Sequence, residues 1–61
     1  MSAIRVEAAR VVRAAFSAGE TVEAIAARYG VATRTVYRWM ADSRERPSRT
    51  VAGRILAARK A

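Results

Sequence analysis

The side chains with the greatest capacity for chemistry in this 61-residue chain are its arginines. Arg34 and Arg38 are four residues apart, so a helix places them one above the other on the same face. A guanidinium presents its N–H donors as a planar fork, which matches a phosphate or the O6 and N7 acceptors of guanine. With Thr35 between them, this spacing predicts a surface that binds phosphates and base edges.

Other kinds of chemistry lack the residues they require. The chain has no cysteine, which excludes disulfides, thiolate metal sites and cysteine nucleophiles. It has no histidine, which removes the commonest general base and transition-metal ligand. Asp42 and Glu45 lack a third ligand, and we expect them to pair with Arg38, Arg46 or Arg49. We therefore expect no catalytic residue, metal site, cofactor or small-molecule substrate.

The charge is strongly positive and unevenly distributed. Twelve Lys and Arg residues against five Asp and Glu give a net charge of +7, which favours a polyanionic partner. Residues 1–30 carry a net +1 and residues 31–61 a net +6, so we expect the second half to hold that partner. No apolar run approaches the roughly 18 residues of a membrane span. We expect no membrane partner and a cytoplasmic location at the nucleoid. From Met1 we also expect that the 61 residues are a complete protein.

The elements that position these side chains are predicted to be helices throughout. The first helix has an apolar stripe at helical spacing and ends at Gly19. The stripe consists of Ile4, Ala8, Val11, Val12, Ala15 and Phe16. Thr21 is expected to cap a second helix over residues 22–29, and Gly30 to end it. Thr33 is expected to cap a third helix over residues 34–43.

The remaining residues are predicted to form a linker and a last helix. Residues 44–48 are charged and contain the only proline, which indicates a basic linker. Ser48 is expected to cap an amphipathic helix over residues 49–60, with Val51, Ile55 and Leu56 on its apolar side. The predicted fold class is all-α, a three-helix domain over residues 2–43 with an additional C-terminal helix.

The pair of short helices at residues 22–43 has the spacing of a helix-turn-helix. Gly30 supplies a positive φ at the turn, and apolar side chains recur where the two helices must face each other. The expected core of the motif is Ile25, Ala26, Tyr29, Gly30, Val31, Val36 and Trp39, with Met40 beside it.

The run IAARYGVATRTVYRW, from Ile25 to Trp39, resembles the helix-turn-helix family of bacterial and phage DNA-binding proteins. It looks most like the homeodomain-like version found in transposases, DNA invertases and resolvases, and the resemblance covers residues 4–43. Ala32 replaces the serine that is usual in that family, and we expect Thr33 to take over its capping role.

The resemblance implies a sequence-specific protein that binds double-stranded DNA and reads the major groove with helix 34–43. It would be a transcriptional regulator or a recombination or transposition factor. We expect Arg34, Thr35 and Arg38 to read bases. The residues expected to contact the DNA backbone are Thr21, Arg28, Thr33, Tyr37, Arg44, Arg46 and Arg49.

Alternatives rest on the last third of the chain. The C-terminal helix could pack back on the domain, form a homodimer, or become ordered only on DNA. A small adaptor or antitoxin-like interaction protein would use its apolar side to bind a protein partner. A winged, excisionase-like factor would instead form a hairpin over residues 44–56, which Pro47 and Gly53 permit.

Overall fold

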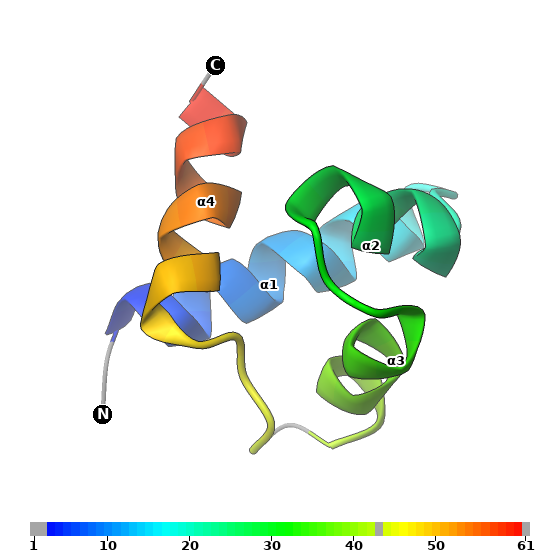
Figure 1. The fold of residues 1–61 in the computed structure, drawn as a ribbon, viewed down its shortest axis with the longest axis horizontal. Helices are drawn as coiled ribbons and strands as arrows, with labels where there is room; N and C mark the ends of the chain where they lie inside the picture. Colours follow the sequence, from blue (N-terminus) through cyan, green and yellow to red (C-terminus); the bar gives the residue numbers. More distant parts are fainter. Residues whose placement is uncertain (1–2, 43, 61) are drawn as a thin grey trace.

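The computed structural model describes residues 3–42 and 44–60, and all their regular structure is helical. The helices are α1 (Ala3–Ser17), α2 (Val22–Tyr29), α3 (Thr33–Ala41) and α4 (Arg49–Lys60) (Figure 1). The all-α prediction, a helix-turn-helix bundle with an additional C-terminal helix, is confirmed. The alternative of a hairpin wing is wrong, because α4 covers the residues that its second strand would need.

Gly19 ends α1 as the sequence predicts. Its φ is +102°, a conformation that side chains with a Cβ rarely adopt. The Gly19 N–H donates to the Phe16 carbonyl at 3.0 Å, and the Glu20 N–H donates to the Ala15 carbonyl at 3.2 Å. These two bonds form a Schellman motif, which satisfies carbonyls at the helix end and turns the chain toward α2.

The buried side of α1 differs from the predicted stripe. Ala8, Ala9 and Val12 are buried, and Val11 and Ala15 are partly buried. Ile4 and Phe16, which the predicted stripe includes, are 48% and 46% exposed, so neither belongs to its buried part. Both lie in terminal turns of α1, where the neighbouring helices no longer cover it. Ala9 is buried although the stripe omitted it.

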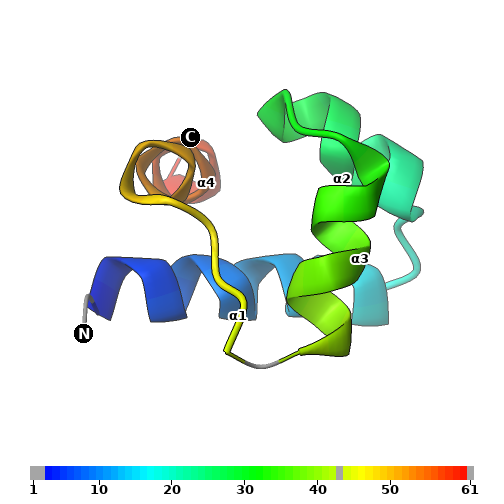
Figure 2. The ribbon, with the colours of Figure 1, turned by 60° about the horizontal axis from the view of Figure 1, so that its bottom comes forward.

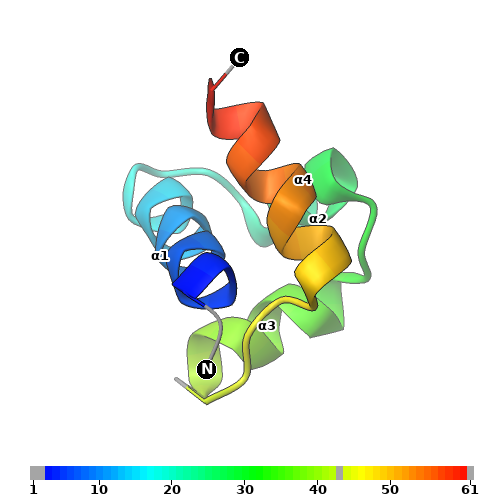
Figure 3. The same cartoon turned by 90° about the vertical axis from the view of Figure 1, so that its left-hand side faces the viewer.

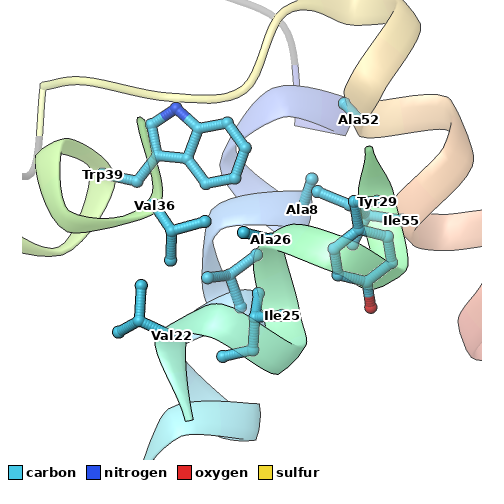
Figure 4. Packing of buried hydrophobic residues seen from close by; sticks show 10 residues of the cluster. Ala8, Val22, Ile25, Ala26, Tyr29, Val36, Trp39, Ala52 and Ile55 are labelled. Carbon is cyan, nitrogen blue, oxygen red and sulfur yellow. The ribbon is translucent and has the colours of Figure 1, made fainter. Parts of the chain in front are cut away.

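The core forms where all four helices meet, and Figure 4 shows most of its members. Val36 and Trp39 of α3 point toward α2 and α1, and Tyr29 of α2 lies beside Ile55 of α4. The buried cluster consists of Ala8, Val12, Val22, Ile25, Ala26, Tyr29, Val36, Trp39, Ala52 and Ile55. Its side chains are mostly small or β-branched, which suits the close approach of short helices.

α4 folds back mainly on α1, with a smaller contact to α2. Figure 2 shows it crossing the N-terminal half of α1, and Figure 3 shows the same pair of helices from the side. Ser48 caps it as predicted, since the Val51 N–H donates to Ser48 Oγ at 3.3 Å. Ala52 and Ile55 are fully buried, so the apolar side of α4 is covered within the chain. None of the helices in residues 3–42 and 44–60 is long and apolar enough to cross a membrane.

Candidate nucleic-acid interface

The start of α2 is fixed by Thr21, which has an extended backbone (φ −78°, ψ 153°). Its hydroxyl accepts a hydrogen bond of 3.1 Å from the Ala24 N–H, so the predicted cap is confirmed. Glu23 in the first turn adds a negative charge at the positive end of the helix dipole. Thr21 itself is exposed on the surface.

Gly30 turns the chain between α2 and α3. Its φ of +69° and ψ of 37° are left-handed, and its N–H donates to the Ala26 carbonyl. The Val31 N–H donates to the same carbonyl at 3.0 Å, and Val31 itself is half-buried. This turn reverses the chain in three residues and sets α3 across α2, the arrangement of a helix-turn-helix.

α3 begins one residue earlier than predicted. Thr33 is its first residue, and the N-cap is Ala32, which has an extended backbone and no side-chain hydrogen bond. The prediction that Thr33 caps this helix is therefore wrong. The backbone makes the start instead, since the Ala32 carbonyl accepts from the Thr35 N–H at 3.0 Å.

The predicted end of α3 at Ser43 lies outside the described residues. The helix ends at Ala41, and Asp42 already has an extended backbone (φ −131°, ψ 115°). Its N–H still donates to the Arg38 carbonyl at 3.1 Å, which closes the last turn.

The two sides of α3 differ sharply in burial. Val36 is fully buried and Trp39 is 5% exposed, and Met40 packs partly against the same core. Arg34 and Arg38 are exposed on the other side. Because the buried residues fix the rotation of α3 about its axis, they also fix which direction these two guanidinium groups face.

The other predicted site residues on α3 lie around those two arginines. Tyr37 is 55% exposed, an unusual position for a large aromatic ring. Thr33 is exposed in the first turn, whereas Thr35 is half-buried at the flank of the face. The structure therefore brings together one exposed surface, which we call the α3 face: Thr33, Arg34, Tyr37 and Arg38.

Arg28, expected to contact the DNA backbone, already has partners within the chain. It forms an ion pair with Glu20, and its guanidinium carbon lies 5.9 Å from the centre of the Tyr29 ring. The hydrogen bond with Glu20 raises the pKa of Arg28 above its ordinary value. Both side chains are at least one-third exposed, so the pair adds little stability and can open for a phosphate.

Residues 44–49 form an ordered basic segment, which we call the basic arm. The Arg44 N–H donates to Asp42 Oδ1 at 2.9 Å, while the Arg44 side chain is 90% exposed. Pro47 is fully buried, so the segment predicted as a linker is anchored at its centre. Arg49 is exposed in the first turn of α4. The arm thus comes shortly after α3, with Pro47 buried and Arg44 and Arg49 exposed.

Sequence reasoning missed two contacts that α1 makes with this region. Arg5 and Arg13 donate hydrogen bonds to backbone carbonyls of the arm and of α3. These carbonyls are 26 to 42 residues distant in the sequence. The four-residue spacing of Arg5, Ala9 and Arg13 on one helix face was the available signal.

Comparison with known proteins agrees with this geometry. The family model for homeodomain-like domains matches residues 2–51, which include the helix-turn-helix and the basic arm. No curated protein and no solved structure matches the chain.

Proposed function

This chain belongs to the homeodomain-like family, whose helix-turn-helix binds DNA, and we propose that it recognises specific double-stranded sequences through the major groove. The observation that carries the proposal is the α3 face. Two arginines four residues apart lie exposed on a short helix whose opposite side is locked into the core by Val36 and Trp39. A rigidly held helix with such donors can enter a groove about 12 Å wide.

We assign base reading to Arg34 and Arg38, each able to donate two hydrogen bonds to a guanine. Thr35 is half-buried, so it reaches only the edge of the groove, where a thymine methyl group or a phosphate is the nearest target. This division leaves specificity mainly to two side chains. A site read in this way is rich in G·C pairs at the positions that face α3.

Phosphate contacts are proposed on the α3 face and around it. Their proposed donors on the motif are Thr21 at the start of α2, Arg28, Thr33 and Tyr37. The proposed donors on the basic arm are Arg44, Arg46 and Arg49. Phosphate contacts fix the register of a protein on DNA without reading sequence. Together with the +7 net charge, they give binding that weakens steeply as salt rises.

The biological role that fits is a transcriptional regulator or a recombination or transposition factor, acting at the nucleoid in the cytoplasm. A single module of this kind buries only about 600–1,000 Å² on DNA, which limits selectivity. Two copies on adjacent half-sites would supply the rest. Such a dimer uses a surface other than the Ala52 and Ile55 side of α4, because that side is covered by the chain itself. An adaptor was favoured by an apolar side of the C-terminal helix that needed a partner, and this burial within the chain removes that need.

The experiment that tests the proposal compares Arg38→Ala with Arg10→Ala, a matched change at an exposed arginine of α1. Fluorescence anisotropy is measured on a duplex selected from a randomised pool and on random duplex DNA. The unchanged protein should bind the selected duplex at least about a thousandfold more tightly. Arg38→Ala should cost about 1–3 kcal/mol on the selected duplex and much less on random DNA.

Two results would contradict the proposal. Equal losses on both duplexes would make Arg38 a phosphate anchor and remove its base-reading role. Equal affinities of the unchanged protein for both duplexes would remove sequence specificity altogether, leaving an electrostatic grip on DNA.

A further inference from the structure

Two arginines of α1 donate hydrogen bonds to the two neighbouring parts of the proposed interface, the end of α3 and the basic arm. Arg13 Nη2 donates to the Trp39 carbonyl at 3.2 Å, in the last turn of α3. Arg5 Nε donates to the Pro47 carbonyl at 2.7 Å, and Arg5 Nη2 donates to the Arg46 carbonyl at 3.3 Å. Hydrogen bonds from a charged guanidinium are stronger than those between neutral groups. The end of α3 and the basic arm are therefore both hydrogen-bonded to side chains of α1.

The two arginines lie on one face of α1. Arg5, Ala9 and Arg13 follow one another at intervals of four residues, which stack on a helix surface. Ala9 is 4% exposed, so the surface between the two guanidinium groups is covered.

The basic arm has no regular structure before α4, yet successive backbone groups are bonded. The Glu45 N–H donates to the Asp42 carbonyl at 3.0 Å, which forms a turn at the start of the arm. The carbonyls of Arg46 and Pro47 are held by Arg5, and Ser48 caps α4 at the other end. Figures 1 to 3 all show this yellow segment passing the N-terminal part of α1.

We propose that Arg5 is a positioning residue that holds the basic arm in a fixed place, so that Arg44 and Arg49 meet DNA phosphates next to the groove that α3 occupies. Arg5 itself touches no DNA in this arrangement. An arm that is ordered before binding loses less conformational entropy on DNA, which preserves affinity. This inference rests on the proposed DNA binding and deepens it, since it names a second, preformed part of the interface.

The test compares Arg5→Met with Arg10→Met. Both variants remove one positive charge from α1, and only Arg5 contacts the arm. The readout is the slope of log Kd against log salt on the selected duplex. Each phosphate contact contributes about 0.9 to this slope, so losing the contacts of Arg44 and Arg49 lowers it by about two. Arg5→Met should lower the slope by about one to two units more than Arg10→Met does.

A thermodynamic cycle separates positioning from a general loss of structure. In a background carrying Arg44→Gln, Arg46→Gln and Arg49→Gln, Arg5→Met should lower the slope no more than Arg10→Met does. Equal slopes for the two Met variants in the unchanged background would overturn the inference. So would an extra loss from Arg5→Met that persists when Arg44, Arg46 and Arg49 are already neutral.

A measurement on the unchanged protein keeps the inference testable if Arg5→Met fails to fold. In ¹⁵N NMR spectra of the free protein, the Arg5 Nε–H should exchange slowly with solvent. The amides of Arg44 and Ser48 should show heteronuclear NOE values like those of α3. Rapid exchange together with low NOE values would overturn the inference. Failure of the proposed sequence recognition would appear separately, as equal affinity of the unchanged protein for selected and random duplexes.

Discussion

Truncation of one buried side chain tests whether α4 is part of the domain. Ile55 of α4 is fully buried, and it lies against α1 and beside Tyr29 of α2 (Figure 4). Ile55→Ala removes three carbon atoms, worth about 2.4 kcal/mol at roughly 0.8 kcal/mol per buried CH₂ group. The cavity left behind brings the loss to about 2.5–5 kcal/mol. The total stability of 61 residues is about 3–9 kcal/mol, so the substitution removes a large share of it.

The same substitution at Ile4 is the matched control. Ile4 is 48% exposed, so truncation forfeits about half of the transfer free energy and leaves no closed cavity. Alanine also favours the helix more than isoleucine does, by a few tenths of a kcal/mol. We expect Ile4→Ala to lower the free energy of unfolding by less than about 1 kcal/mol. The gap between the two variants measures what α4 contributes by folding back.

The assay is thermal unfolding followed by far-ultraviolet circular dichroism at two protein concentrations. For a domain of this size, each kcal/mol shifts the midpoint by about 4–8 °C. Ile55→Ala should therefore melt at least about 10 °C below the unchanged protein, independently of concentration. Similar midpoints for the two variants would refute the packing of α4 on α1. A gap between the midpoints of the unchanged protein and Ile55→Ala that changes with concentration would place Ile55 in an interface between two chains.

The remaining predictions concern glycines and use the same thermal assay. Gly30→Val should cost about 1–2 kcal/mol through its positive φ alone, because the nearest atom to an added Cβ is 3.8 Å away. Gly30→Asn should cost less, since asparagine tolerates this conformation, and equal losses would mean that φ is not the cause. Gly53→Ala should stabilise α4 by about 0.5–1 kcal/mol, as nothing lies within 4 Å of the added Cβ. Gly19→Ala should instead destabilise the protein, because φ there is +102°. A loss of stability in Gly53→Ala would contradict the helical conformation of Gly53.

The helices and their limits were largely predictable because their signals are local. Thr21 and Ser48 cap helices, and Gly19 and Gly30 end them, through hydrogen bonds that span three to five residues. Ala32 shows the limit of such signals. The neighbouring Thr33 is the better capping residue by type, yet Ala32 occupies the N-cap position of α3. The turn after Gly30 sets the path of the chain and thereby the residue at which α3 begins.

Burial was less predictable than helicity. Periodicity places Ile4 and Phe16 on the apolar side of α1, but a helix pattern does not tell how far along its length other helices cover it. The same limit applies to Ala52, a small residue with a weak apolar signal that becomes fully buried once α4 crosses α1.

By itself, the sequence determined the all-α class, the helix-turn-helix and the two arginines of the α3 face, because each follows from spacing within about fifteen residues. The tertiary structure alone decided that α4 folds back and that the basic arm is held by Arg5. Those contacts join residues about forty positions apart. Many chain paths satisfy the same local pattern, and the buried apolar surface and hydrogen-bonded carbonyls of the complete fold select one of them.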